Sequence, residues 1–308
     1  MQTNNPDISI VIPVYGCSTC LIELNNRLTE ILCQISENYE IIFVNDASPD
    51  NSWEIIKKLA ENNNKIRGIN LLRNFGQQNA ILAGLSYTIG KATIVMDCDL
   101  QDQPEEIINL YNTYKQGFDF VLGRRINRED NFIRKFSSKL FYKIFNFFTG
   151  NISDYTTSNF GIYSNNVIEN YKLLPEKIKL LPLMAKMQGF KVGFVNVIHS
   201  KRKTGKSSYN TYKLLSFAFN IFISHTNKPL KLFIKLGFLL SLFSGIYLFY
   251  LIFRKLYLDI PIGWTSIMVS IFFIGGLLFA NLGIIGLYIG KIYDEVKNRP
   301  LFTVKETT

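Results

Sequence analysis

Two different periods of apolar residues alternate along the first part of the chain. Short apolar runs predict buried strands at 8–15, 40–45, 66–72, 92–96, 119–123 and 192–198. Between several of these runs, apolar residues recur at helical spacing, which predicts helices at 21–35, 52–61, between 72 and 89, and at 180–189. Strands that alternate with helices predict an α/β domain with a mainly parallel sheet and helices on both of its faces.

Two longer apolar stretches follow in the last part of the chain. Residues 236–253 and 260–290 carry no charged side chain. Each is long enough to cross a hydrocarbon core of roughly 30 Å, so we expect a transmembrane hairpin within 231–308, with spans at about 236–253 and 264–290. Lysine and arginine residues outside the two spans outnumber Arg254 and Lys255 in the link 254–259, which predicts that both termini are cytoplasmic.

Two further segments are predicted to lie in the membrane interface. As a helix, residues 132–148 have a broad apolar face, while Lys135, Lys139 and Lys143 follow one another four residues apart on the other face. Such helices commonly lie in the interface plane, although an ordinary helix that faces the core has a similar pattern. Residues 211–230 are expected to form a second interfacial helix next to the hairpin.

Composition and charge indicate an anionic partner. Lys and Arg total 34 against 24 Asp and Glu, a formal net charge of +10. Nucleic acid, a phospholipid surface or a phosphorylated substrate would suit that charge. The 25 Phe and 16 Tyr residues favour a membrane over nucleic acid.

The cysteine pattern favours reduced thiols in a cytosolic domain. The chain has four cysteines, Cys17, Cys20, Cys33 and Cys98, which include a single Cys-X-X-Cys. A zinc site or a redox motif is the alternative, but there is no second cysteine pair and there are only two histidines.

Candidate chemistry gathers directly after the predicted strand 92–96. Asp97, Asp99 and Gln101 follow within a few residues, at the edge of the sheet where open α/β folds bind their ligands. Their hard oxygen atoms suit Mg²⁺ or Mn²⁺. Asp102 or Gln103 has a simpler alternative role, which is to cap a helix that carries Pro104 in its first turn.

The segment Asp97-Cys98-Asp99-Leu100-Gln101-Asp102 resembles the Asp-X-Asp motif of glycosyltransferase family 2. Its longer Asp-X-Asp-Leu-Gln form is similar to the polyprenyl-phosphate branch of that family, which includes dolichyl-phosphate mannose synthases and bacterial undecaprenyl-phosphate sugar transferases. The resemblance implies a Rossmann-like GT-A catalytic domain at residues 1–210.

The resemblance also implies roles for individual residues. The expected catalytic residues are Asp97, Asp99, Gln101 and Arg202, with Asp99 and Gln101 as metal ligands. The expected nucleotide-sugar contacts are Pro13, Tyr15, Asp46, Asn74, Gly76, Asp97 and Ser207, and the expected acceptor-phosphate contacts are Arg125, Arg134 and Ser138. A helix-capping turn is the alternative for Asp46.

The segment that contains Arg202 and Ser207 resembles the loop that closes over the donor diphosphate in the family. It matches the family pattern at Arg202, Gly205, Ser207 and Tyr209. Its Gly-Lys-Ser run is not a P-loop, because Ser200 stands where that motif requires a glycine.

The sequence departs from the family pattern at three places. Gly16-Cys17 follows Tyr15 where relatives usually have Asn-Glu, and Gln77 stands where a lysine is common. Asn159 and Gly161 replace an acid and an arginine. These departures leave the choice of nucleobase open.

The implied reaction moves one sugar, with inversion, from a nucleoside-diphosphate sugar to a polyprenyl phosphate such as undecaprenyl phosphate. UDP is favoured over GDP, and the enzyme would work on the cytoplasmic face of the inner membrane. The acceptor phosphate is already an anion, so it needs no general base. A processive polysaccharide synthase and a non-enzymatic membrane scaffold with a decayed transferase domain are the alternatives. The sugar, the oligomeric state and the product's destination, lipopolysaccharide or another cell-envelope glycan, stay open.

Overall fold

The computed structural model describes residues 5–126, 157–174, 176, 180–198, 228–257 and 263–308. Its chain divides into two compact units. The first contains the sheet together with the end of the chain, Pro300–Thr308, and the second contains two long helices.

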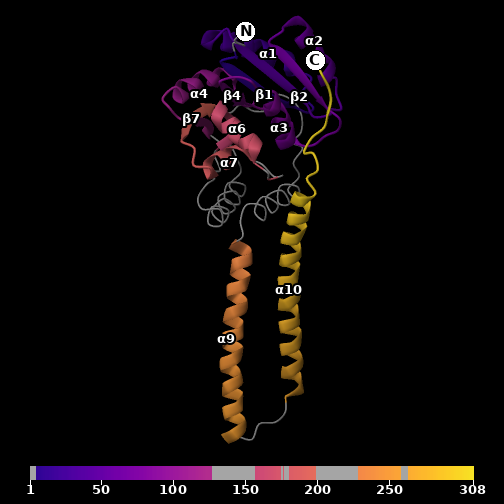
Figure 1. Ribbon diagram of the computed structural model, residues 1–308, viewed down its shortest axis with the longest axis vertical. Helices are drawn as coiled ribbons and strands as arrows, with labels where there is room; N and C mark the ends of the chain where they lie inside the picture. Colours follow the sequence, from indigo (N-terminus) through magenta and orange to yellow (C-terminus); the bar gives the residue numbers. More distant parts are fainter. Residues whose placement is uncertain (1–4, 127–156, 175, 177–179, 199–227, 258–262) are drawn as a thin grey trace. The chain divides into compact units, whose positions relative to one another are not determined.

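The first unit is built on an eight-stranded sheet in the order β7-β5-β6-β4-β1-β2-β3-β8 (Figure 1). The strands are β1 (Ile8–Val14), β2 (Tyr39–Asn45), β3 (Ile66–Leu71), β4 (Ala92–Val95), β5 (Phe120–Ile126), β6 (Thr157–Ser164), β7 (Val192–Ile198) and β8 (Val304–Thr307). β1 pairs in parallel with β2 and β4, β2 with β3, and β5 with β7. β6 and β8 are antiparallel to their neighbours, so the sheet is mixed but mostly parallel, as a GT-A fold requires.

Helices cover both faces of this sheet because its inner strands are apolar on both sides. The helices of the unit are α1 (Leu21–Ile35), α2 (Ser52–Asn62), α3 (Gln77–Tyr87), the 3-10 turn η1 (Pro104–Glu106), α4 (Ile107–Tyr114), α6 (Asn165–Leu173) and α7 (Leu181–Met187). Ile8, Ile10 and Ile12 of β1 belong to the core that includes α1, α2 and α4. Val11 belongs to the other core, with α3, α6 and α7.

The predicted alternation of strands and helices is confirmed in the described part of the catalytic unit. α1 and β7 have the predicted bounds, and the other predicted elements differ from the observed ones by a few residues at their ends. β6, β8 and α6 were not predicted, and the helix considered with Pro104 in its first turn is found as η1 followed by α4. β6 inserts between β4 and β5 although it follows both in the chain.

β8 joins the end of the chain to the edge of the sheet. The Asn70 amide Nδ2 donates to Glu306 Oε1 at 2.8 Å, and the Gly68 backbone N–H donates to Thr308 Oγ1 at 2.8 Å. β8 therefore covers the backbone groups that β3 would otherwise expose as an edge strand. The sequence analysis placed these residues in a cytoplasmic tail and expected no strand there.

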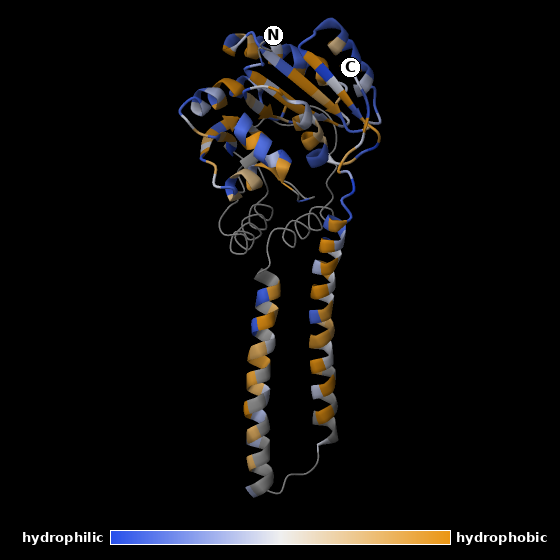
Figure 2. Ribbon diagram, viewed as in Figure 1, coloured by the Kyte–Doolittle hydropathy of each residue, from blue (hydrophilic) through white to orange (hydrophobic). Residues whose placement is uncertain are grey.

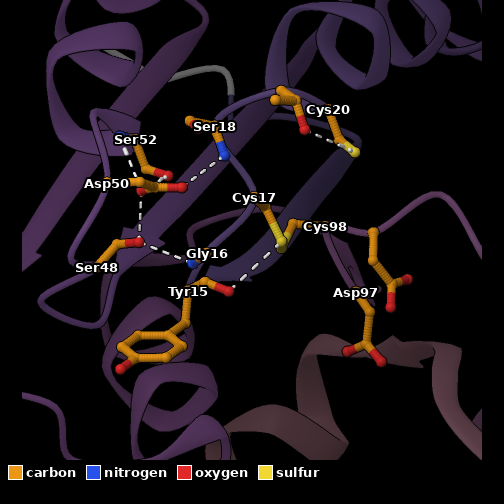
Figure 3. The surroundings of a disulfide bond; sticks show 12 residues. Tyr15, Gly16, Cys17, Ser18, Cys20, Ser48, Asp50, Ser52, Asp97 and Cys98 are labelled. Carbon is orange, nitrogen blue, oxygen red and sulfur yellow. Dashed lines mark hydrogen bonds between the residues drawn. A yellow bond between two sulfur atoms is a disulfide. The ribbon is translucent and has the colours of Figure 1, made fainter. Parts of the chain in front are cut away.

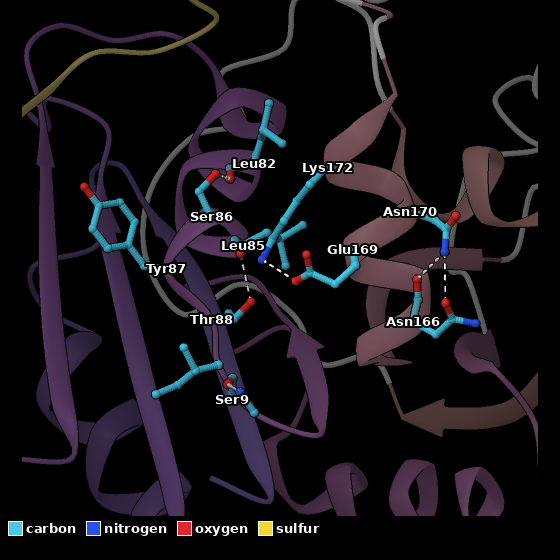
Figure 4. A network of polar contacts seen from close by, with 12 residues as sticks. Ser9, Leu82, Leu85, Ser86, Tyr87, Thr88, Asn166, Glu169, Asn170 and Lys172 are labelled. Carbon is cyan, nitrogen blue, oxygen red and sulfur yellow. Dashed lines mark hydrogen bonds and ion pairs between the residues drawn. The ribbon is translucent and has the colours of Figure 1, made fainter. Parts of the chain in front are cut away.

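α3 lies close to β1 and β2 because Gly84 has no side chain. A Cβ atom at Gly84 would lie 2.4 Å from Val11 Cγ1 and 2.9 Å from Val44 Cγ2. The helix ends where the Thr88 hydroxyl donates to the Leu85 carbonyl oxygen at 2.8 Å, and the chain then enters β4 (Figure 4). This close packing sets where the first residue of α3, Gln77, reaches the carboxyl edge of the sheet.

The second unit contains α9 (Lys228–Tyr257) and α10 (Trp264–Val296). Hydrophobic residues predominate along the described parts of both helices (Figure 2), and many of them are exposed. Among the described residues, Phe273–Val296 is the one segment long and apolar enough to cross a membrane, and Phe233–Ser244 is a shorter apolar segment. The two predicted helices are therefore present, and one candidate span is found.

Gly84→Ala should destabilise the catalytic unit by about 1–3 kcal/mol, because the added methyl group overpacks the contact with Val11 and Val44. Thermal unfolding of the purified protein measures the effect. Ser86→Ala is the control, since Ser86 is exposed on the same helix, and it should change stability by no more than about 0.5 kcal/mol. Equal stability of the two variants would contradict the close approach of α3.

Candidate active site

Four parallel strands deliver the predicted nucleotide-binding residues to one edge of the sheet. Tyr15 follows β1, Asp46 follows β2, the turn 73–76 follows β3, and Asp97 follows β4. Parallel neighbours end on the same side, so these positions meet although they are far apart in sequence. The strand order reverses between β1 and β4, and open α/β sheets bind ligands at such a switch point.

Three carboxylates gather beyond β4. Asp99 and Asp102 are buried, and Asp97 is half-buried. Burial raises the pKa of Asp97 to about 6, and repulsion from Asp102 and Asp99 adds to the rise, while Arg125 and Gln77 oppose it. The Gln77 side-chain Nε2 donates to Asp97 Oδ1 at 2.6 Å. The cluster thus concentrates negative charge in a partly desolvated place.

The backbone between these carboxylates has an unusual conformation. Leu100 is buried and has a φ of 58°, in the left-handed region that bulky residues rarely adopt. The Gln101 backbone N–H donates to Asp99 Oδ1 at 3.1 Å, which fixes the Asp99 carboxylate against the turn. Strained backbone of this kind is concentrated at functional sites.

Asp102 forms an ion pair with Arg125, which lies near the end of β5. Arg125 Nη2 donates to Asp102 Oδ2 at 3.0 Å, and the Asp102 side chain is 1 % exposed. Gln103 occupies the N-cap position of η1 but makes no side-chain cap hydrogen bond, so the capping alternative is not seen for either residue. Arg125, predicted as an acceptor-phosphate contact, therefore also lies beside the carboxylate cluster.

Asp46 organises the turn that precedes α3. Its two carboxylate oxygens accept from the backbone N–H groups of Phe75 at 2.7 Å and Gly76 at 2.9 Å. Burial raises the pKa of Asp46, and these two hydrogen bonds oppose the rise. Asp46 thus holds the turn that contains Asn74 and Gly76 at the edge of the sheet.

The remaining predicted residues lie outside the described part of the chain. These are Arg134 and Ser138, the helix 132–148, the loop residues Arg202 and Ser207, and most of the segment 211–230. Pro13 is buried within β1, and Tyr15 is 46 % exposed beyond its end.

The loop 97–102 has the donor atoms for a hard divalent cation, but it does not surround a cation on all sides. Within the described residues, no group of three or more His, Cys, Asp and Glu side chains is arranged to hold a metal ion. Mg²⁺ and Mn²⁺ usually take one or two protein carboxylates and complete their shells with water and substrate phosphates. The residues present fit that kind of shared site, with Asp99 and Gln101 on the strained turn.

Comparison with known proteins identifies the family. The model described as "Glycosyl transferase family 2" matches residues 9–173. The chain belongs to glycosyl transferase family 2. It is therefore a glycosyltransferase, and the resemblance seen in the Asp97–Asp102 motif is confirmed.

Two relatives are similar over nearly their whole length. The SfII prophage-derived bactoprenol glucosyl transferase of Shigella flexneri is 32% identical over 302 residues, which cover 97% of this chain and 98% of the relative. The undecaprenyl-phosphate 4-deoxy-4-formamido-L-arabinose transferase of Shewanella sediminis is 34% identical over 304 residues, or 97% and 92% of the two chains. Both names belong to the polyprenyl-phosphate branch of the family.

A solved structure has the same fold at low identity. Glucosyl-3-phosphoglycerate synthase from Mycobacterium tuberculosis, in complex with Mn²⁺, UDP-glucose and phosphoglyceric acid, matches with a TM-score of 0.54 and 14% identity. The match covers 71% of this chain and 78% of the synthase, and it supports the GT-A fold of the first unit.

Sequence reasoning missed three features of this site. Gln77 was noted only as a departure from the family pattern, yet it contacts Asp97. The ion pair between Asp102 and Arg125 was not predicted. The prediction that all cysteines are reduced thiols was wrong for this structure, in which Cys17 and Cys98 form a disulfide.

Mn²⁺ binding by the free enzyme should weaken as the pH falls through about 6, because a proton then competes with the metal for Asp97. Below that pH, apparent affinity should fall by about ten-fold per unit if binding requires the ionised carboxylate. Metal titrations between pH 5 and 8 measure this dependence.

Asp97→Asn should remove the pH step in metal affinity. Glu37→Ala, which removes an exposed carboxylate elsewhere, should keep it.

The stability of the metal-free protein should depend on pH in the opposite direction. The folded state binds this proton more tightly than the unfolded chain does, because the pKa of Asp97 is about 6 in the folded state and 3.8 in the unfolded chain. In the metal-free protein, the free energy of unfolding therefore falls as the pH rises from about 4 to about 6. A pH step that persists in Asp97→Asn would contradict the role of this carboxylate.

Proposed function

We propose that this enzyme transfers a single sugar from a nucleoside-diphosphate sugar to a polyprenyl phosphate. The carboxylate cluster beyond β4, at the switch point of the sheet, is the observation that carries the donor half of the reaction. The relatives named for bactoprenol and undecaprenyl phosphate support the acceptor half.

The donor lies against the carboxyl edge of β1 to β4. Asp46 and the turn that it holds face the nucleoside, together with Pro13, Tyr15, Asn74 and Gly76. Asp97 faces the ribose or the metal shell, and Asp99 and Gln101 hold Mg²⁺ or Mn²⁺. When bound, the metal neutralises charge on the leaving diphosphate and orients it. UDP is the favoured nucleotide. The synthase solved with UDP-glucose and Mn²⁺ supports that choice, because it shares the fold of the first unit.

The acceptor phosphate binds beside Arg125, next to the carboxylate cluster. Asp102 holds Arg125 there, and the Arg125 Nε atom is buried without a hydrogen-bond partner among the described residues. An unsatisfied guanidinium N–H is suited to a phosphate oxygen, because arginine keeps its charge and donates in a planar fork. Arg134 and Ser138 complete this contact, and Arg202 and Ser207 close over the donor diphosphate.

The membrane helices anchor the enzyme in the membrane that carries its lipid acceptor. The apolar segment Phe273–Val296 supports one crossing, and the length of α9 supports a second. We infer a multi-pass protein of the inner membrane whose catalytic unit is cytoplasmic, where nucleotide sugars are made.

The direct test is an assay with membranes, labelled UDP- and GDP-sugars and lipid extraction. A single sugar on the extracted lipid supports the proposal, whereas a growing polymer favours a processive synthase and no transfer favours a non-enzymatic scaffold. Asp99→Ala should lower transfer by roughly a hundred-fold or more, about 3 kcal/mol of barrier, since it removes the main metal ligand. Glu37→Ala should transfer normally, and normal turnover by Asp99→Ala would exclude this metal site.

Arg125→Ala should raise the apparent KM for a short-chain polyprenyl phosphate by roughly ten-fold or more, because a charged phosphate contact is lost. Arg125→Lys should restore only part of the loss, since lysine lacks the fork. Kinetics at saturating donor, with calorimetry of UDP binding as the control, separate acceptor from donor effects. A loss confined to UDP binding would move Arg125 to the donor side.

A reporter that is active only outside the cytoplasm should work when it is fused within the link 254–259 and should fail at Thr308, because both termini are expected to be cytoplasmic. Reporter activity in whole cells measures this, with the complementary cytoplasmic reporter as the control. The reverse pattern would separate the catalytic unit from its nucleotide sugars.

A further inference from the structure

The Cys17–Cys98 bond joins the two loops that border the switch point of the sheet. Cys17 lies just beyond β1 and Cys98 just beyond β4, and these strands are parallel neighbours. Cys98 stands between Asp97 and Asp99, and in Figure 3 its sulfur points toward Cys17 while the Asp97 carboxylate points the other way. The two cysteines are 81 residues apart in sequence, with Cα atoms 6.3 Å apart.

Other contacts already hold each loop on its outer side. The Gly16 backbone N–H donates to Ser48 Oγ at 2.7 Å, and the Ser18 backbone N–H donates to Asp50 Oδ2 at 2.9 Å (Figure 3). On the other side, Gln77 holds Asp97. Between the two loops themselves, the disulfide is the covalent connection. Breaking it would remove this connection while each loop keeps its outer contacts.

A cytoplasmic setting makes this bond a reversible one. Cytoplasmic disulfides are generally transient, because glutathione and thioredoxin systems reduce them, and those that occur are usually catalytic or redox-sensing. The positions of Cys17 and Cys98 do not suit catalysis of sugar transfer, since both side chains are buried and their sulfurs are bonded to each other. Their position does suit control of a ligand that contacts both loops.

We propose that Cys17 and Cys98 form a redox-controlled site whose disulfide assembles the binding site for the donor nucleotide. This inference rests on the proposed function, since it places the donor at the same sheet edge. With the bond formed, Tyr15 and the Asp97–Asp99 loop are fixed together before the nucleotide arrives, so binding costs less ordering of the loops. With the bond reduced, the nucleotide must order the two loops itself and binds more weakly.

The exchange reaction balances with a disulfide as the oxidant. Cys17 and Cys98 thiols react with a low-molecular-weight disulfide, such as oxidised glutathione, through a mixed disulfide. The protein loses two protons and two electrons, one sulfur–sulfur bond forms in the enzyme, and the oxidant leaves as two thiols. A dithiol reductant reverses each step.

Linkage gives the proposal a second measurable consequence. If the disulfide raises nucleotide affinity by some factor, then bound nucleotide stabilises the disulfide by the same factor. A ten-fold effect corresponds to a shift of about 30 mV in the reduction potential of the pair, toward more negative values.

The experiment uses the full-length protein in detergent, poised with oxidised glutathione or with dithiothreitol. Mass spectrometry of differentially labelled peptides maps the bond in each state. Calorimetry with UDP and Mn²⁺, and with GDP in parallel, measures nucleotide affinity. We expect a Cys17–Cys98 peptide in the oxidised protein only, and roughly five-fold or more tighter nucleotide binding by that form.

Single-cysteine variants provide the matched controls. Cys17→Ser and Cys98→Ser should each bind nucleotide with the affinity of the reduced protein under both conditions, and either variant suffices if the other fails to fold. Cys33→Ser, which removes an exposed thiol on α1, should keep the full redox response.

Three results would overturn the proposal: equal or weaker nucleotide affinity in the oxidised form, a disulfide between Cys17 and Cys20 instead, or no disulfide under oxidising conditions. Failure of the proposed function is distinguishable. If neither form bound UDP or GDP, the donor assignment would be wrong, while a bond that appears with oxidant and disappears with reductant would still support the reversible cysteine site.

Discussion

The parallel pairing of β1 with β2 and β4 is the constraint on which the site depends. All residues of these three strands are buried, so their ladder can neither slip nor fray without exposing apolar side chains. The pairing brings Val14, Asn45 and Val95 near one edge, and every loop that leaves this edge begins from a fixed point. Polar residues that a strand could not accommodate are thereby collected in one place.

Electrostatics at this edge follow from that collection. Burial in the turn raises the pKa of Asp97, and repulsion from Asp102 and Asp99 adds to the rise. Arg125 supplies a positive charge beside these carboxylates. A divalent cation shared with a diphosphate, as in the proposed reaction, would remove the imbalance, and such a shared site needs few ligands from the protein.

The loops at this edge are positioned by contacts with one another as well as by the strands that they follow. Asp46 binds the turn before α3, Asp50 binds the turn after β1, and Gln77 at the start of α3 binds Asp97. Cys17 and Cys98 close the remaining gap between the first and the fourth strand. Three of these contacts join loops from neighbouring strands, and the Gln77–Asp97 contact joins the loops of β3 and β4 across the two strands between them. The geometry of this edge therefore depends on all four connections.

The sequence by itself determined the local elements and the class of chemistry. Strand and helix periods are properties of consecutive residues, so α1, β7 and the alternation between them could be predicted, as could the Asp97–Asp102 motif. The partners of these residues could not. β6 and β8 pair with strands that are distant in sequence, Arg125 lies against Asp102 because β5 adjoins that loop, and Cys17 meets Cys98 across 81 residues. Strand order decides such contacts, and strand order follows from burial of both faces of the whole sheet, which no short window of sequence contains.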